Sequence, residues 1–123
     1  MQRPSKKELF GKLRDARAAV KQENIFLIDQ DVIAGHAIEL GYDIGDELPQ
    51  VLAELLEETT VHHYAGSRPP QKSYKQDIEG LELFPFVIES RRFACRVYLK
   101  FAVSEDSLWL VSLHQDRPME KPS

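Results

Sequence analysis

Near the end of the chain, side chains that can move protons and hold anions gather on two consecutive segments. Arg96, Tyr98 and Lys100 alternate with apolar residues, and His114 stands in the next alternating segment. Because successive side chains of a strand point to opposite faces, the guanidinium, the phenol and the amine share one face. A phenol and an imidazole can transfer protons, and cationic groups bind phosphate. These residue types therefore predict acid–base chemistry on a phosphate-bearing substrate.

Burial determines how the two segments pair, because a slip of one residue sends every side chain to the other face. The apolar pairs that we expect across this hairpin are Val103 with Trp109, Phe101 with Val111, and Leu99 with Leu113. The same register places Tyr98 opposite His114 and Lys100 opposite Ser112. We therefore expect the phenol and the imidazole to lie side by side on the polar face of the sheet.

The first half of the chain is predicted to supply helices. Residues 5–58 carry apolar side chains at helical spacing, with Ser5 as the cap of the first helix and Gly41 as the stop of the second. Residues 25–28 are expected to form an extended link between these helices. His36 lies near the apolar stripe of the second helix, so we expect it to be partly buried rather than functional.

The second half is predicted to supply strands. Residues 59–116 contain alternating segments, among them 59–64 and 81–88, and Pro85 favours an edge position for the latter. Helices followed by strands predict an α+β fold, in which the helices pack on one face of an antiparallel sheet. We expect a single domain over residues 1–123 that ends in a flexible tail at 117–123.

Composition limits the class of protein. The chain has 123 residues, 42% of them hydrophobic, and no apolar run long enough to cross a membrane. Its N-terminus does not read as a signal peptide, and its single cysteine suits a reducing cytoplasm. The net charge of −4 argues against tight nucleic-acid binding, but residues 61–100 carry 7 Lys or Arg against 4 Asp or Glu.

Three short strings and the order of the elements resemble the MqsR family of toxins from bacterial type II toxin–antitoxin systems, within the RelE-like ribonucleases. The strings are AIELGYD at 37–43, VYLK at 97–100 and LVSL at 110–113. The resemblance implies a RelE-like fold and a sequence-specific mRNA endoribonuclease that needs neither metal nor cofactor. It also implies arrest of translation and neutralisation by a cognate antitoxin.

The resemblance assigns roles to individual residues. The strand tyrosine of the family falls on Tyr98, and its C-terminal lysine falls on His114, whose imidazole suits proton transfer near neutral pH. The earlier lysine of the family falls near His62 and His63, of which at most one can face the site if they lie on a strand. Gln76 corresponds to a glutamine of the central loop. The catalytic candidates are His114, Tyr98, His63 and Lys100.

Cationic and polar residues around these positions are candidates for contact with RNA phosphates. The RNA-binding candidates are Arg96, Arg91, Arg92, Lys72, Lys75, Gln76 and Arg68. We predict no metal site, because no Cys, His or Asp set with ligand spacing accompanies the adjacent histidines. The expected partners are mRNA, an antitoxin protein and the ribosome, in the cytoplasm and without a membrane.

The acidic helices support a second hypothesis of a different class. Residues 1–60 carry 7 Lys or Arg against 12 Asp or Glu, and the third helix is especially acidic. In this hypothesis the chain is a non-catalytic immunity-like or adaptor protein, and the acidic face of residues 43–58 docks a basic protein partner. Mutation of His114 would leave such binding unchanged.

Overall fold

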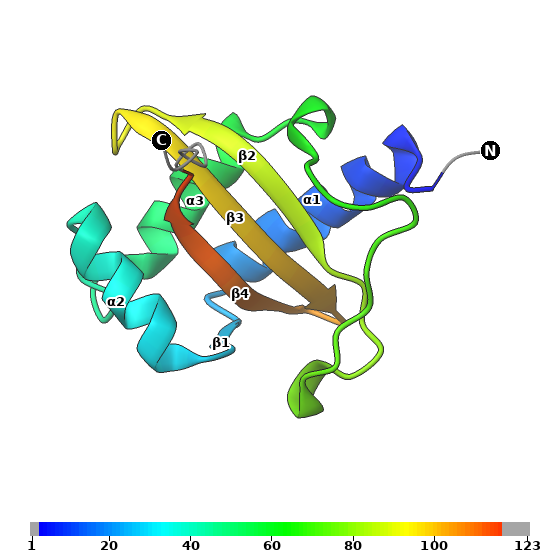
Figure 1. Ribbon diagram of the computed structural model, residues 1–123, viewed down its shortest axis with the longest axis horizontal. Coiled ribbons are helices and arrows are strands. Elements are labelled where there is room, and N and C mark those ends of the chain that lie inside the picture. Colours follow the sequence, from blue (N-terminus) through cyan, green and yellow to red (C-terminus); the bar gives the residue numbers. More distant parts are fainter. Residues whose placement is uncertain (1–2, 117–123) are drawn as a thin grey trace, which may run out of the picture.

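The computed structural model describes residues 3–116 and has an α+β fold, with N-terminal helices and C-terminal strands as the sequence predicts. The tail at 117–123, for which we predict flexibility, lies outside the described residues. Four strands form one sheet in the order β1–β4–β3–β2 (Figure 1). The elements are α1 (Lys6–Lys21), β1 (Ile25–Leu27), α2 (Gln30–Leu40), α3 (Leu48–Glu58), the 3-10 turns η1 (Val61–His63) and η2 (Gln76–Ile78), β2 (Phe84–Ser90), β3 (Cys95–Ser104) and β4 (Ser107–Gln115).

Helices α1 and α3 cover one face of the sheet (Figure 1). The Ser5 hydroxyl accepts a hydrogen bond from the Glu8 amide at 3.1 Å, which caps α1 as predicted. The apolar stripe of α3 packs with α1 and the strands in the main core. The Arg17 guanidinium joins the two helices, because it donates hydrogen bonds to the carbonyls of Leu56 and Thr59. This layer leaves the opposite face of the sheet for other contacts.

The segment that the sequence predicts as an extended link forms an additional strand. β1 pairs in parallel with β4, and Phe26 lies opposite Trp109. The chain then enters α2 through Asp29, whose side chain makes no capping bond, and leaves it through Gly41 with φ of 86°. The glycine therefore ends the helix as predicted, because it adopts a left-handed conformation without a Cβ clash.

The prediction of a strand over residues 59–64 is wrong. Residues 61–63 form a 3-10 turn, and only Tyr64 makes a β-bridge, to Phe86. The cause is local: the Thr60 hydroxyl accepts from the His62 amide, and His63 Nδ1 accepts from the Thr60 amide at 2.9 Å. These bonds give the backbone an alternative to strand pairing. The expectation that His62 and His63 point to opposite faces of a strand therefore no longer applies.

The hairpin register is as predicted from Tyr98 to Lys100 and differs from the prediction beyond Lys100. Leu99 lies opposite Leu113, Tyr98 opposite His114 and Lys100 opposite Ser112. A bulge then skips Val111, which changes the remaining pairs. The observed pairs beyond it are Phe101 with Leu110, Ala102 with Trp109, and Val103 with Leu108. The bulge allows Leu108, Leu110 and Leu113 all to enter the main core.

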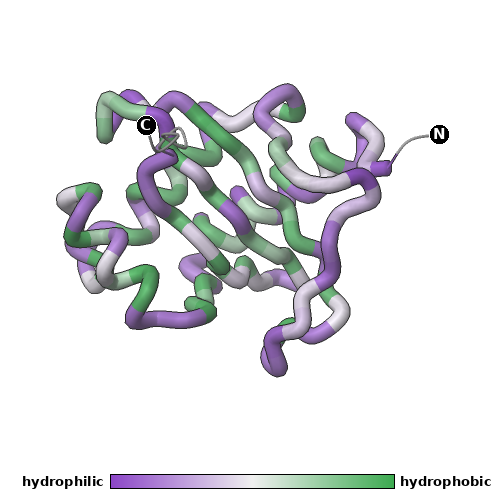
Figure 2. Tube along the Cα trace, viewed as in Figure 1, coloured by the Kyte–Doolittle hydropathy of each residue, from purple (hydrophilic) through white to green (hydrophobic). Residues whose placement is uncertain are grey.

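The bulge also moves Trp109 away from the place that the sequence predicts. Trp109 lies outside the main core, on the other face of the sheet, and its ring stacks on Phe26 with centroids 4.6 Å apart. Strand β2 begins at Phe84, three residues later than predicted, and Pro85 lies on the edge strand as expected. Hydrophobic and hydrophilic residues alternate along the strands (Figure 2).

A long loop over residues 65–83 crosses one corner of the sheet face opposite α1 and α3 (Figure 1). Ile78 and Leu83 from this region pack with Ile28 and Ala102 in a second, smaller core. We call the remainder of that face, which carries Tyr98 and His114, the open face. Within residues 3–116 no helix has both the length and the apolar character needed to cross a bilayer.

Candidate active site

The open face brings together the two residues that the sequence pairs for proton transfer. Tyr98 on β3 lies directly opposite His114 on β4. Their rings stack with centroids 5.1 Å apart and an interplanar angle of 17°. Both side chains are half-buried, so they are partly removed from water but remain reachable from the face. The phenol and the imidazole thus form a preorganised pair, which we call the Tyr98–His114 pair.

A backbone contact determines which nitrogen of His114 carries the proton. His114 Nδ1 lies 2.9 Å from the carbonyl oxygen of Gln115. A carbonyl oxygen can only accept, so Nδ1 must donate and carries the hydrogen in the neutral ring. The lone pair of the neutral imidazole is then on Nε2. This tautomer makes His114 suitable as a general base.

The environment of Tyr98 keeps its hydroxyl able to donate a proton. Burial raises the pKa of Tyr98, and the negative charge of Asp116 raises that pKa further. The phenol therefore stays protonated at neutral pH and can donate a hydrogen bond or a proton. The sequence leaves open which of the two residues acts as acid. The structure favours His114 as the base and Tyr98 as the donor.

A second histidine reaches this pair from a distant part of the chain. The ring of His36 on α2 lies 4.9 Å from the ring of His114, centroid to centroid, at an interplanar angle of 53°. His36 is half-buried, as predicted, but its Nδ1 is fully buried and has no hydrogen-bond partner in the described part of the chain. A buried nitrogen without a partner among the described residues costs stability, as does the buried Tyr42 hydroxyl.

Lys100 supplies a cation beside the pair. Its Nζ lies 6.0 Å from the centroid of the Tyr98 ring. No carboxylate of residues 3–116 forms an ion pair with it. An ammonium group without a counter-ion among the described residues is available to a phosphate. Lys100 and Tyr98 also line a pocket of about 170 Å³ between the sheet and the loop at residues 65–83.

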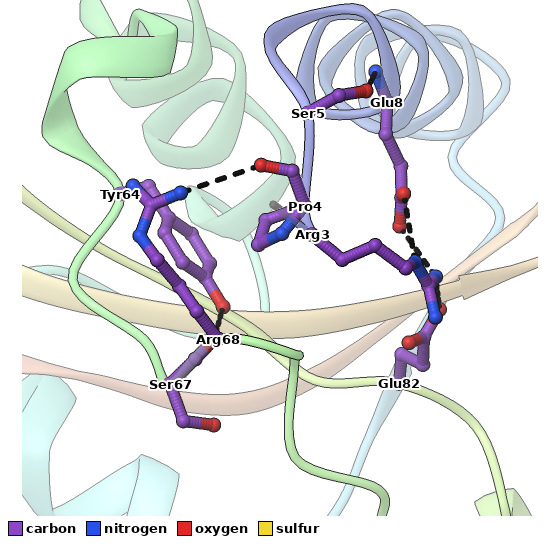
Figure 3. A network of polar contacts seen from close by, with 8 residues as sticks. All are labelled: Arg3, Pro4, Ser5, Glu8, Tyr64, Ser67, Arg68 and Glu82. Carbon is purple, nitrogen blue, oxygen red and sulfur yellow. Dashed lines mark hydrogen bonds and ion pairs between the residues drawn. The ribbon is translucent and has the colours of Figure 1, made fainter. Parts of the chain in front are cut away.

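The loop wall of this pocket is held by a polar network (Figure 3). The Tyr64 hydroxyl donates to the carbonyl of Ser67 at 2.6 Å, and the Arg68 guanidinium lies over the Tyr64 ring. Arg68 also donates to the carbonyl of Pro4 at 3.4 Å. Nearby, Arg3 bridges Glu8 and Glu82 at 2.9 and 3.0 Å. The segment before α1 and the central loop are thereby joined, so the pocket has a supported wall.

His63, a predicted catalytic residue, does not line the same pocket as Tyr98 and Lys100. It lines a wide depression of about 1480 Å³, whereas the smaller pocket belongs to Tyr98 and Lys100. His63 Nδ1 is already occupied as the acceptor for the Thr60 amide. The charged residues that line the depression with it are Glu57, Glu58, Glu89, Arg91, Arg96 and Asp116. The depression reaches onto the open face, because its lining includes Val87, which pairs with Tyr98 across the sheet. Its four carboxylates make it less suited to an anionic substrate than the surface around Lys100.

The predicted RNA-binding residues fall into two groups. Four of them have partners in the protein: Arg92 binds Glu47 at 2.6 Å and Glu54 at 2.8 Å, Lys75 binds Asp29, Arg91 binds Glu58, and Arg68 contacts Tyr64 and Pro4. A phosphate would have to compete with two carboxylates for Arg92. Lys72, Gln76 and Arg96 are exposed and form no ion pair within residues 3–116.

Among the described residues, no group of three or more His, Cys, Asp or Glu side chains is placed to hold a metal ion. Comparison with known proteins adds no relative: no protein-family model matches the chain, and no curated protein matches its sequence. The geometry of the open face is therefore the basis for a functional proposal.

Proposed function

We propose that this chain is a toxin-like endoribonuclease, similar to the MqsR family, that cleaves single-stranded mRNA in the cytoplasm. The observation that carries the proposal is the stacked Tyr98–His114 pair beside the ammonium of Lys100, which has no ion-pair partner within residues 3–116. These three groups meet the needs of RNA cleavage through the ribose 2′-hydroxyl, namely a base, a proton donor and a cation.

The proposed reaction begins at the imidazole. Nε2 of His114 removes the proton from the 2′-hydroxyl, and the 2′-oxygen attacks phosphorus. The bond from phosphorus to the 5′-oxygen breaks, and the Tyr98 hydroxyl donates its proton to that oxygen. An alkoxide is a stronger base than a phenolate, so this transfer is downhill despite the raised pKa of Tyr98. Lys100 neutralises charge on the non-bridging oxygens, and the products are a 2′,3′-cyclic phosphate and a 5′-hydroxyl.

The competing hypothesis of an acidic docking face is less well supported by the contacts. The arginines of the β2–β3 connection already neutralise three carboxylates on or next to α3, because Arg92 binds Glu47 and Glu54 and Arg91 binds Glu58. Fewer free charges therefore remain for a basic partner. Neutralisation by an antitoxin and action on the ribosome remain part of the toxin proposal.

The proposal is tested with purified protein in two settings: free single-stranded RNA in EDTA, and mRNA on translating ribosomes in a Mg²⁺ buffer without the chelator, because ribosomes themselves need Mg²⁺. We expect cleavage by the wild type, and a loss of about 100-fold or more in His114→Gln and Tyr98→Phe, as for removal of a general acid or base. His62→Gln and Tyr74→Phe are matched controls, because both side chains are exposed, and they should cleave at the wild-type rate. Intact RNA in both settings would overturn the proposal.

A further inference from the structure

Six of the eight residues that line the pocket beside Tyr98 and Lys100 have no role in the proposed cleavage chemistry. Its volume of about 170 Å³ is well below that of sites for drug-sized ligands, so it admits one small ring system. It lies between β3, β2 and the loop at residues 65–83. The lining residues are Ala65, Gly66, Ser67, Gln71, Leu83, Pro85, Tyr98 and Lys100.

The lining is divided into apolar walls and a polar edge. The half-buried Tyr98 ring offers the apolar face on which a flat ring can stack, and Leu83 and Pro85, which are buried, back this side of the pocket. Ser67, Gln71 and Lys100 supply the polar groups. A nucleobase has this same division, with apolar faces and a hydrogen-bonding edge.

The hydrogen-bonding capacity of the polar edge is still available. The Gln71 side chain is exposed and makes no hydrogen bond within residues 3–116, although its backbone carbonyl accepts from the Leu83 amide. Its amide can therefore both donate and accept. The Ser67 hydroxyl donates to the Pro69 carbonyl at 2.9 Å, which leaves the oxygen as an acceptor for a ligand.

The wall that carries these groups is fixed in place. A Cβ on Gly66 would lie 2.5 Å from the Tyr64 hydroxyl oxygen and 2.7 Å from Pro85 Cδ, so the loop backbone packs directly on both. The Ala65 amide donates to the Pro85 carbonyl at 2.9 Å. A preformed wall reduces the entropic cost of ordering a ligand.

From these observations we propose that the pocket binds one nucleobase of a single-stranded RNA and thereby selects the cleaved sequence. The inference rests on the proposed ribonuclease function for its substrate class. With a base in the pocket, the phosphate of the same nucleotide lies near Lys100, and the stacked Tyr98–His114 pair adjoins it. Gln71 and Ser67 read the edge of the base.

The test is an NMR titration of the full chain with each nucleoside 3′-monophosphate, and with inorganic phosphate as a separate probe. At least one nucleotide should shift the amide signals of Gly66, Ser67 and Gln71, whereas phosphate alone should not. Gln71→Leu should weaken the preferred nucleotide about tenfold, the loss expected for one or two neutral hydrogen bonds. Gln50→Leu is the matched control, since Gln50 is exposed on α3, and it should bind within about twofold of the wild type.

The same variants separate this inference from the proposed chemistry. If nucleotides bind at the pocket but RNA stays intact, the pocket assignment stands and the ribonuclease proposal fails. If RNA is cleaved but Gln71→Leu changes neither nucleotide affinity nor sequence preference, the pocket assignment fails and the chemistry stands. Equal shifts with phosphate alone would also overturn the assignment, because they would indicate an anion site.

Discussion

The most demanding structural prediction concerns one substitution, glycine to alanine, at two positions with opposite expected effects. At Gly66 the new Cβ would lie 2.5 Å from the Tyr64 hydroxyl oxygen and 2.7 Å from Pro85 Cδ. Neither neighbour can move freely, because Tyr64 is bonded to the Ser67 carbonyl and Pro85 belongs to β2. Overpacking of this kind costs about 1–3 kcal/mol. We therefore expect Gly66→Ala to lower the free energy of unfolding by that amount.

Gly35 provides the matched comparison. It lies within α2, and a Cβ there would meet nothing within 4 Å. Alanine is favoured over glycine in a helix interior by about 1 kcal/mol, so Gly35→Ala should raise the free energy of unfolding by roughly that amount. Urea denaturation of the full chain, extrapolated linearly to water, measures both changes. The reasoning is refuted if Gly66→Ala is as stable as the wild type.

Three further changes have defined outcomes. Tyr42→Phe should raise the free energy of unfolding by about 1 kcal/mol, because the Tyr42 hydroxyl is buried without a hydrogen-bond partner among the described residues. Burial raises the pKa of Tyr42 to about 12, so the wild type should lose stability as the pH rises from 10 toward 12, where the unfolded chain ionises first. The variant should lose less over this range, because only Tyr64 and Tyr98, whose pKa values burial also raises, still contribute. Arg17→Met should lower the free energy of unfolding by about 1–2 kcal/mol, because it removes the hydrogen bonds to the end of α3. Lys100→Met should reduce the salt dependence of RNA binding by about 0.7 in log–log slope, as for one lost phosphate contact, whereas the exposed Lys21→Met should not.

For each of these three predictions, one result would contradict the reasoning. A Tyr42→Phe protein less stable than the wild type at pH 7 would mean that the hydroxyl has a partner. An unchanged unfolding midpoint in Arg17→Met would show that the bonds between α1 and α3 add nothing. RNA binding is measured by fluorescence anisotropy in a His114→Gln background, in which the RNA should stay intact. Equal salt dependence of binding with and without Lys100→Met would show that Lys100 does not contact the phosphate.

The sequence predicts the Tyr98–His114 pairing because this part of the hairpin alternates strictly and a slip would expose its apolar side. It does not predict the rest of the register. The bulge at Val111 turns Leu108, Leu110 and Leu113 all into the main core, and nothing in the alternation of apolar and polar residues marks its position. The error at His63 has a similar origin. The residue types at 59–64 are typical of a strand, but the Thr60 side chain caps a 3-10 turn over Val61–His63 instead.

His36 shows a different limit of sequence reasoning. Its partial burial follows from the helical stripe, but its contact with His114 depends on where α2 lies beside β4. That position is set by β1, a three-residue strand with no alternation to reveal it. Likewise, contacts across the fold decide that Arg92 has two carboxylate partners, whereas Lys100 has no ion pair in the described part of the chain. The N-terminal helices and C-terminal strands, by contrast, follow from spacing and caps.

The chemical nature of the RNA ends tests the central claim most directly. Attack by a 2′-hydroxyl, with His114 as the base, leaves a 2′,3′-cyclic phosphate and a 5′-hydroxyl, and a 2′-deoxy substitution at the scissile nucleotide should block the reaction. Mass spectrometry of products formed in EDTA reads these ends without ambiguity. We expect cyclic phosphate ends and an uncut 2′-deoxy substrate. Cleavage of the 2′-deoxy linkage, or products with 3′-hydroxyl ends, would contradict the mechanism.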